Sequence, residues 1–277
     1  MLRLPRLKSS AMRASRFIGK FRVGLRRQKQ CLHALFVRDL MMRYGREHLG
    51  FIWVVLEPML LTVGVLVLWS VIKGGYEHGV RVVELVLTGY MTLTLWRHLT
   101  NSMSLLFRRS IGLLYHSRIT LLDVVFSRIL LEFAGTTTAL LFVLITLVLF
   151  GVVAPVQDWS LVIGGWFLMA LLAAGVGLVL LIATERNETA EKFIQPIQYL
   201  LVPLSGIFFM VSWLPQTAQE LILFNPMVHT VEMLRAGFFG AGVETHFSAW
   251  YVLGWSGLLI FMGMVGVEKL RKDLQIS

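Results

Sequence analysis

The chain has 277 residues, of which 56% are hydrophobic and only 15% charged, and its mean hydropathy is +0.72. Soluble domains carry about 25% charged residues, so this composition excludes a soluble domain and predicts an all-α polytopic membrane protein. The net charge of +10 would favour a nucleic-acid partner in a soluble chain, but ten of the 26 Lys and Arg residues lie in residues 1–30, which hold no Asp or Glu. That clustering is typical of a positive-inside, headgroup-facing segment, so no nucleic-acid partner is expected.

Residues 1–27 are predicted to form a basic cytoplasmic arm. The longest apolar run before residue 31 is two residues, so no signal peptide is expected. An Arg-rich, acid-free start is also compatible with an organellar transit peptide, an alternative that three serines in the first thirty residues weaken. The single cysteine, Cys31, predicts neither an intramolecular disulfide nor a cysteine-based metal cluster.

Residues 28–50 are predicted to form an amphipathic helix that lies in the membrane interface. Apolar side chains recur there at helical spacing while charged ones occupy other positions, which is the pattern of a helix with one face in lipid. The apolar positions are Leu32, Leu35, Phe36 and Leu40. The apolar span that follows starts sharply at Gly50, which is therefore a candidate hinge, and Pro58 prevents a rigid continuation of the helix.

Six apolar stretches within the predicted transmembrane domain, residues 51–270, are each expected to cross a hydrocarbon core of about 30 Å. They cover residues 52–72, 82–106, 124–150, 161–183, 193–211 and 249–267, and a cytoplasmic tail follows at 271–277. The basic amphipathic stretch 107–123 is too short and too charged to cross, so it is predicted to lie at the membrane surface.

The segment between the fifth and sixth spans, residues 213–241, holds two short apolar pieces broken at Asn225 and Pro226. A helix of about fifteen residues reaches only about 21 Å, which is less than the thickness of the hydrocarbon core. We therefore predict a re-entrant helical hairpin here, because two such pieces can dip into the membrane and return.

The distribution of basic residues fixes the predicted orientation. Six spans place 22 Lys and Arg residues on the side that holds both termini and only three on the other side, with Arg97 inside a span. A seventh span at 226–240 would move the basic tail to the opposite side. We therefore predict six spans with both termini in the cytoplasm.

The sequence shows no chemistry for catalysis. It has no Gly-rich phosphate loop, no cluster of His, Asp and Glu at metal-ligand spacing, and no close acid–base pair, so no enzyme activity, metal or cofactor is expected in this chain. Few ionisable groups lie in the spans: Glu57, Glu84, Arg97, His98 and Glu132. This pattern is best explained if transport through the chain is driven by energy from another protein. The alternatives are a stand-alone proton-coupled transporter that uses Arg97 and His98, or an intramembrane enzyme.

Two motifs resemble those of ABC-2 type export permeases. The first is Arg43-Tyr44-(x4)-Leu49-Gly50-(x2)-Trp53-(x4)-Pro58, with Glu57 before the proline, and the second is Asn225-Pro226-(x2)-His229-(x2)-Glu232-(x2)-Arg235. Their order, spacing and span count match over residues 28–270, and the chain most resembles the capsular-polysaccharide permeases of that family. One departure is in the surface stretch, where relatives often carry a proline and this chain has Ser117 and Arg118.

The resemblance implies a partner set and a cargo. It implies a homodimer of this chain with two ATP-binding cassette subunits, which would bind ATP and Mg, in the bacterial inner membrane. The cargo would be lipid-linked capsular polysaccharide, passed on to periplasmic or outer-membrane export proteins. Permeases for O-antigen, teichoic acid, lipid or drug are the alternatives within the same family.

The resemblance also implies that residues 107–123 form a coupling helix that rests in a groove of the ATPase. The residues expected at that docking surface are Arg108, Arg109, Leu113, Leu114, Tyr115, His116 and Arg118. The alternative is an ordinary amphipathic segment at the membrane surface.

A conduit for polysaccharide would need aromatic faces for sugar rings and polar groups for hydroxyls. The candidate lining residues are Trp53, Trp69, Tyr90, Trp96, Arg97, Gln195, Gln198, Tyr199, Phe208, Phe209 and Trp213. Aromatic side chains in membranes also serve packing and interfacial anchoring, and glutamines also bond helices together, so both interpretations stay open.

Two further alternatives stay open at this stage. Arg97 either pairs with Glu57 or faces the conduit and attracts an anionic polymer. The second motif, Asn225 to Arg235, either stabilises the re-entrant turn or forms a gate at the outer mouth.

Overall fold

The computed structural model describes residues 28–41, 50–73, 76–114 and 119–276. The predicted basic arm therefore lies outside the described residues, as do Arg43, Tyr44, Leu49, Tyr115, His116 and Arg118. Along the described helices, the side chains of Trp53, Glu57, Pro58, Leu113 and Leu114 also lie outside the description.

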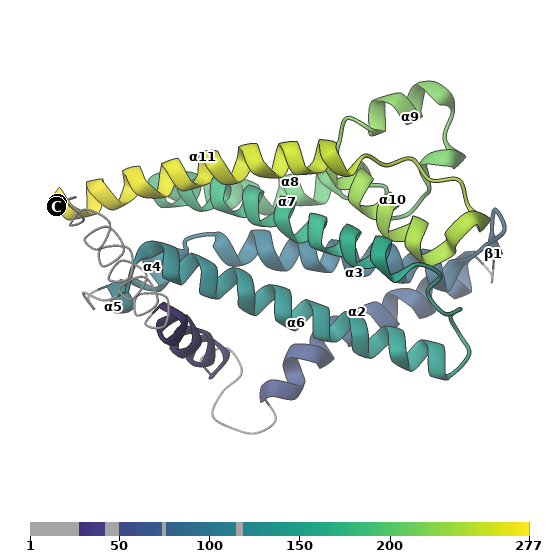
Figure 1. The fold of residues 1–277 in the computed structure, drawn as a ribbon, viewed down its shortest axis with the longest axis horizontal. Helices are drawn as coiled ribbons and strands as arrows, with labels where there is room; N and C mark the ends of the chain where they lie inside the picture. The colour runs from purple at the N-terminus through teal and green to yellow at the C-terminus, as the bar shows by residue number, and fades with distance from the viewer. Residues whose placement is uncertain (1–27, 42–49, 74–75, 115–118, 277) are drawn as a thin grey trace, which may run out of the picture.

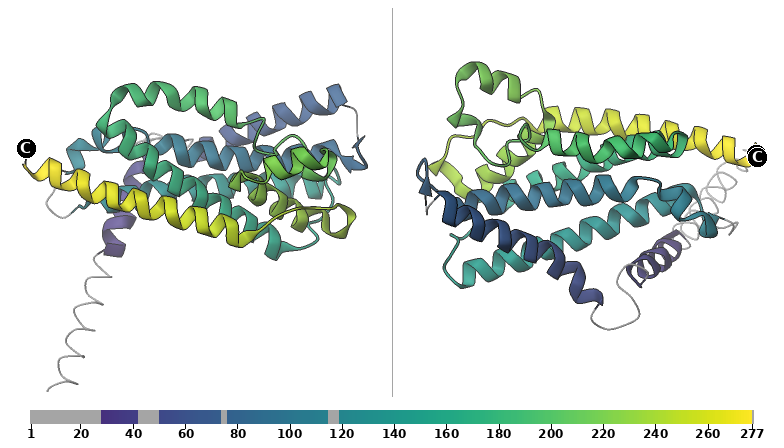
Figure 2. Two further views of the ribbon diagram at one scale, coloured as in Figure 1. Left: turned by 90° about the horizontal axis from the view of Figure 1, so that it is seen from above. Right: turned by 180° about the vertical axis from the view of Figure 1, so that it is seen from behind.

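Five long helices form most of the described chain, and apart from α2 they run roughly along the longest axis of the molecule (Figure 1). They are α2 (Gly50–Lys73), α3 (Val82–Met103), α6 (Leu121–Leu149), α7 (Trp159–Arg186) and α11 (Ala249–Ile276). Helix α7 is central, because it packs against α3, α10 and α11. Figure 2 shows α2 inclined to this bundle.

Shorter elements occupy the two ends of the bundle. One end holds the N-terminal helix (residues 28–41), α4 (Leu106–Arg109) and α5 (Ile111–Leu114). The opposite end holds β1 (Tyr76–Glu77), β2 (Val80–Arg81), η1 (Val211–Trp213), α9 (Gln216–Ile222) and η2 (Gly240–Gly242). Helices α8 (Glu188–Leu201) and α10 (Pro226–Phe239) have 14 residues each.

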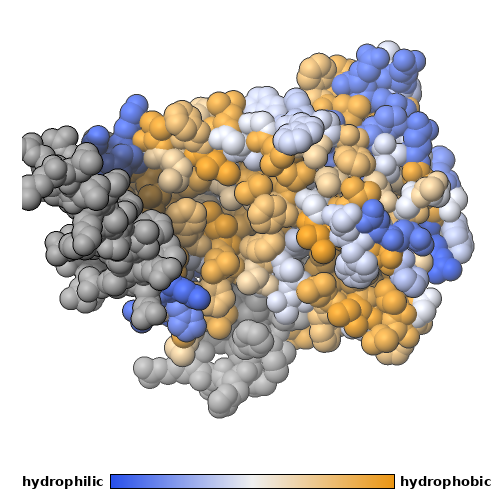
Figure 3. Space-filling view, viewed as in Figure 1, coloured by the Kyte–Doolittle hydropathy of each residue, from blue (hydrophilic) through white to orange (hydrophobic). Residues whose placement is uncertain are grey.

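Three helices in the described part of the chain are long and apolar enough to cross a membrane by length and composition: Leu121–Leu149, Trp159–Arg186 and Ala249–Lys272. Large apolar side chains stay exposed on them, among them Leu149, Phe167 and Phe261. Figure 3 shows that hydrophobic residues cover much of one face, while hydrophilic residues gather at the end that holds α9. An apolar surface of this extent needs lipid or protein against it.

The fifth predicted span differs from the helix in the structure. Helix α8 begins at Glu188 and ends at Leu201, and residues 202–210 follow as turns rather than as the continuous helix predicted over 193–211. Pro203 has no N–H to donate to the preceding turn, and Gly206 has a φ of 71°, so the backbone leaves the helix here.

The surface stretch 107–123 is not one helix either. The structure forms two single-turn helices, α4 and α5, and residues 121–123 already belong to α6. A capping box starts α6, because the Thr120 hydroxyl accepts from the Asp123 N–H and the Asp123 carboxylate accepts from the Thr120 N–H. This reciprocal cap fixes where the surface segment ends.

The loop predicted between the first two spans contains a small β-hairpin, so the described chain is not purely helical. Strands β1 and β2 pair antiparallel with Tyr76 opposite Arg81 and Glu77 opposite Val80. His78 and Gly79 connect them, and both have positive φ, which matches a two-residue hairpin turn.

Helix α7 crosses α10 with backbone close to backbone, which only glycine permits. A Cβ on Gly165 would lie 2.8 Å from the Leu234 nitrogen and 3.0 Å from the Thr230 oxygen. We expect Gly165→Ala to separate the helices and to destabilise the fold by about 1–3 kcal/mol, measured as a lower melting temperature in detergent.

The neighbouring Gly164 is the matched control for that prediction. A Cβ there would meet the Met233 methyl at 2.7 Å, and this is the far end of a flexible side chain. Gly164→Ala should therefore cost clearly less than Gly165→Ala. Equal melting temperatures for the two variants would contradict the close backbone crossing.

Candidate functional site

The connection between α3 and α4 is the first feature of the candidate site. Leu105 has φ 50° and ψ 29°, a left-handed conformation that a leucine rarely adopts. Its N–H donates to the Thr184 hydroxyl at 3.1 Å, near the end of α7. The chain therefore changes direction between α3 and α4 at a position held against α7.

Glu185 is the second feature, at the junction of α7 and α8. One of its carboxylate oxygens accepts from the Phe107 N–H at 2.8 Å and from the Arg108 N–H at 3.2 Å. The Arg108 guanidinium lies 3.5 Å from the other oxygen and donates to the Glu185 carbonyl at 3.1 Å. Farther out, Arg109 donates to Glu191 at 3.1 Å.

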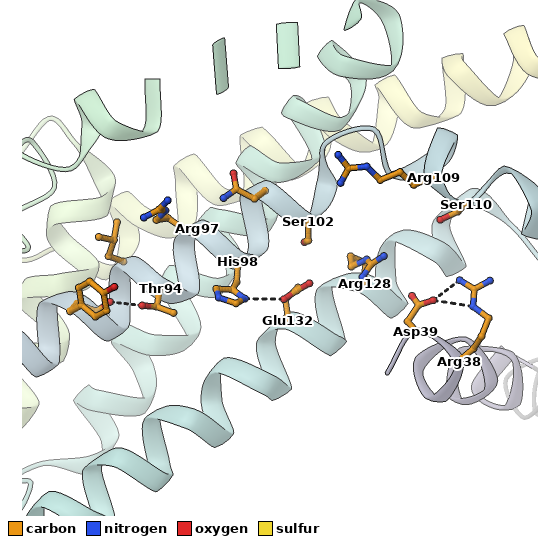
Figure 4. Close-up of a pocket in the computed structure, with 13 residues that line it drawn as sticks. Arg38, Asp39, Thr94, Arg97, His98, Ser102, Arg109, Ser110, Arg128 and Glu132 are labelled. Atoms are coloured by element: carbon orange, nitrogen blue, oxygen red, sulfur yellow. Dashed lines mark hydrogen bonds and ion pairs between the residues drawn. The ribbon is translucent and has the colours of Figure 1, made fainter. Parts of the chain in front are cut away.

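The third feature is a polar cavity of about 630 Å³ at the same end of the molecule (Figure 4). It lies between the N-terminal helix, α3, the α4–α5 segment and α6. The lining residues are Arg38, Asp39, Tyr90, Leu93, Thr94, Arg97, His98, Asn101, Ser102, Arg109, Ser110, Arg128 and Glu132. Four arginines against two carboxylates make this cavity a basic one.

Both carboxylates of the cavity have a partner. His98 Nδ1 lies 3.2 Å from Glu132, whose side chain is 3% exposed, and Arg38 Nε donates to Asp39 at 3.1 Å. Figure 4 shows the first pair bridging α3 and α6. Arg109 pairs with Glu191 outside the cavity, which leaves Arg97 and Arg128 to be accounted for.

Two of those arginines have no carboxylate partner among the residues that the structure describes. The Arg97 guanidinium lies over the Tyr199 ring, 5.3 Å from its centroid, which is a cation–π contact. Arg128 Nε is buried and makes no hydrogen bond to the described residues. A buried donor without an acceptor is costly, so this arrangement favours an anionic ligand in the cavity.

The predicted conduit residues separate into groups. Tyr90 and Arg97 line the cavity, with Tyr199 beside them. The two glutamines attach α8 to α3, because Gln198 donates to Thr100 at 2.8 Å and Gln195 donates to Asn101 at 3.2 Å.

The remaining aromatic candidates lie elsewhere. Trp69 stacks on Phe208 with centroids 5.2 Å apart, and Trp213 stacks on His78 at 4.6 Å. Trp96 belongs to the hydrophobic core between the helices. Which of these aromatic residues face a conduit stays a prediction.

The second motif converges on the irregular backbone after α8. Arg235 is fully buried, and its guanidinium donates to the carbonyls of Gly206, Ile207 and Phe209 at 2.5–2.7 Å. Glu232, 3.9 Å from Arg235, accepts from the backbone N–H of Val211. The motif thus satisfies backbone groups that turns leave without helical partners.

The residues at the start of the second motif also form hydrogen bonds with backbone groups. Asn225 caps α10 by accepting from the Met227 N–H at 3.0 Å, and it donates to the Leu204 carbonyl at 2.8 Å. Pro226 occupies the first turn of α10, where no N–H is needed. His229 lies 2.8 Å from the Leu223 carbonyl and accepts from the Ser248 N–H.

Comparison with known proteins decides the family. The family model described as ABC-2 type transporter matches residues 30–239. The chain belongs to this family. The resemblance drawn from the two motifs is thereby confirmed, and the match runs from the N-terminal helix through α10.

Relatives of this ABC-2 family member align over nearly its whole length. The capsule polysaccharide export inner-membrane protein CtrC of Neisseria meningitidis serogroup A is 36% identical over 248 residues, covering 90% of this chain and 94% of the relative. BexB of Haemophilus influenzae, described in the same words, is 33% identical and covers 92% and 96%. The polysialic acid transport protein KpsM of Escherichia coli is 23% identical and covers 92% and 99%.

Sequence reasoning missed Leu105, Thr184, Glu185 and Arg128. Neither of the two motifs covers these residues, Thr184 and Glu185 near the end of α7 included. Glu57 has no described side chain, so its pairing with Arg97 stays a prediction. The part of the chain that the structure describes contains no group of three His, Cys, Asp or Glu side chains able to hold a metal ion.

Proposed function

We propose that this chain is the membrane-spanning permease subunit of an ATP-driven exporter that moves lipid-linked capsular polysaccharide across a bacterial inner membrane. The observation that carries the proposal is the similarity to capsule polysaccharide export inner-membrane proteins, at 32–36% identity over at least 90% of the chain. The subunit itself is not catalytic. Its energy comes from the hydrolysis of ATP, which a separate ATPase binds together with Mg.

The proposed assembly contains two copies of this chain and two ATP-binding cassette subunits. Six spans, with α10 as part of a re-entrant hairpin, place both termini in the cytoplasm, and periplasmic or outer-membrane export proteins receive the polymer. The α4–α5 segment supports this arrangement, because it exposes Arg108, Arg109 and Ile111 at the end of the bundle that holds the C-terminus. Such a short segment with exposed basic and apolar side chains is suited to dock in a groove of the ATPase.

The basic cavity is the proposed place where the anionic part of the cargo meets the permease. It lies beside the α4–α5 segment, at the level where a lipid-linked polymer would approach from the inner leaflet. Arg97 and Arg128 supply positive charge there, and Tyr90 and Tyr199 supply aromatic faces for sugar rings.

Ile111 provides the direct test of ATPase docking. Its side chain is 59% exposed in α5, so Ile111→Asp changes little inside the permease. We expect the variant to insert normally but to bind the ATPase about tenfold or more weakly, because a carboxylate replaces an apolar side chain on the proposed docking surface. Co-purification of the membrane complex and its dissociation constant measure the effect.

Val152→Asp is the control for the docking test. Val152 is also an exposed apolar side chain, but it lies in the loop that joins α6 to α7 at the opposite end of the bundle, so ATPase binding should stay at the wild-type level.

An exporter that carries no ATPase and still transports without ATP would overturn the proposed function in favour of a stand-alone proton-coupled transporter. If deletion of this permease abolished the export of O-antigen, teichoic acid, lipid or drug and left capsule export intact, that molecule would be the cargo.

A further inference from the structure

Helix α4 is separated from α3 and α5 by breaks in the helical chain and is hydrogen-bonded to α7. The left-handed Leu105 interrupts the helix between α3 and α4, and a second break at Ser110 separates α4 from α5. The side chains of Thr184 and Glu185 in α7 accept hydrogen bonds from three backbone N–H groups, those of Leu105, Phe107 and Arg108, at 2.8–3.2 Å. Residues nearly eighty positions apart therefore form one unit.

The carboxylate of Glu185 is buried and holds α4 against α7. Its side chain is 6% exposed, and it binds both the N-terminal N–H groups of α4 and the Arg108 guanidinium. Moving α4 away from α7 would leave a desolvated charge and unbonded N–H groups at once. The Arg109–Glu191 pair beside it is 58% and 40% exposed, so water replaces that contact easily.

Helix α7 in turn connects this end of the molecule to the opposite end. It packs on α10 through Gly165, and a Cβ on Gly237 of α10 would lie 2.6 Å from the Asp158 carbonyl just before α7. A displacement of α7 is therefore passed on to α10, and through α10 to the Arg235 network, because backbone atoms of the two helices are in close contact (Figure 1).

We infer that Glu185 is the positioning residue that makes α4 and α7 move as one body when the ATPase pushes on α4. This inference rests on the proposed function, because it needs an ATPase at the α4–α5 segment. Glu185 touches no cargo in this arrangement; it acts through α4. Without it, ATP hydrolysis moves α4 about the Leu105 joint while α7 and α10 stay behind.

The test compares Glu185→Ala with Glu191→Ala in the full complex reconstituted in proteoliposomes. The readout is the number of ATP molecules hydrolysed per polymer exported. We expect Glu185→Ala to raise this ratio about fivefold to tenfold, with hydrolysis within about twofold of wild type, because docking survives while transmission fails. Glu191→Ala, which removes the exposed pair, should leave the ratio within about twofold of wild type.

Glu185→Gln is the conservative variant. Its amide oxygen still accepts from the N–H groups of Phe107 and Arg108, while the charge opposite Arg108 is lost. We expect a smaller rise in the ratio than for the alanine variant, and this variant also serves if Glu185→Ala does not accumulate in the membrane. A wild-type ratio in both variants, or a parallel fall of export and hydrolysis, would overturn the inference.

Hydrogen exchange in the isolated permease separates this inference from the proposed function. Because Glu185 accepts from the N–H groups of Phe107 and Arg108, Glu185→Ala should speed their exchange about tenfold or more, whereas Glu191→Ala should not. Unchanged exchange at these two residues would show that the contact is absent. Faster exchange in a permease that has no ATP-dependent export would instead overturn the proposed function alone.

Discussion

Arg235→Met is expected to remove most of the folded permease from the membrane. The Arg235 side chain has 0% exposure, and three backbone carbonyls between Gly206 and Phe209 accept from its guanidinium. Methionine leaves these carbonyls without donors and leaves Glu232 without its cation 3.9 Å away. Breaking a buried pair of this kind costs about 3–5 kcal/mol, a large part of the stability of a typical domain.

Arg235→Lys should recover only part of that loss. A lysine keeps the positive charge, but its single ammonium group does not reproduce the planar fork that reaches three carbonyls at once. Yield and melting temperature of the purified protein in detergent measure both variants. Arg271→Met is the matched control, because Arg271 forms an exposed pair with Glu268 at 3.7 Å and its loss should cost under about 1 kcal/mol.

The same variants separate the two interpretations of the second motif. If Arg235→Met folds with the wild-type melting temperature, the network is not what stabilises residues 202–211. If that folded variant also leaks small polar solutes into proteoliposomes, the motif acts as a gate at the outer mouth. A low yield without leak favours the stabilising role alone.

The long helices could be predicted from the sequence because their signal is local. Apolar runs of eighteen or more residues specify α2, α3, α6 and α7 to within a few residues, and they specify the start of α11, which continues nine residues past the predicted end at 267. The fifth span could not be predicted in the same way. Residues 202–210 are also apolar, and what bends them is Pro203 together with carbonyl contacts to Arg235, which lies about thirty residues further along the chain.

The residues of the candidate site also differ in how far a local sequence signal could predict them. Family motifs identified Asn225, His229, Glu232 and Arg235, but their partners are backbone groups, which carry no side-chain identity in a sequence. Leu105 could not be predicted, because a leucine at positive φ has no sequence signal, whereas glycine or asparagine would have suggested it. The His98–Glu132 pair depends on how α3 and α6 are rotated against each other, and the residue spacing does not contain that information.

The double variant Arg97→Gln/Arg128→Gln is expected to lower capsule export about tenfold or more while the permease still folds and binds its ATPase. Both residues line the basic cavity, and no carboxylate in the described chain pairs with either of them. Glutamine keeps hydrogen-bonding groups but removes the charge, so an anionic cargo group loses its electrostatic attraction to the cavity. Polysaccharide at the cell surface, per molecule of permease, is the measurement.

Arg186→Gln is the matched control for that charge loss. Arg186 is exposed at the end of α7, on the same side of the molecule as the cavity but not in its lining, so export should stay near the wild-type level. Wild-type export by the double variant would exclude the cavity as the place where an anionic cargo group binds. Export should also become less sensitive to ionic strength in the double variant, since the screened attraction is the part removed.

A charge swap then settles the role of Arg97. If Arg97 pairs with Glu57, Glu57→Arg combined with Arg97→Glu restores the export that either single change abolishes. If Arg97 instead binds an anionic cargo group, the swap places a carboxylate in the cavity beside Tyr199 and export stays lost. The cation–π contact with Tyr199 places the guanidinium at the cavity, where it is available to an anionic cargo group.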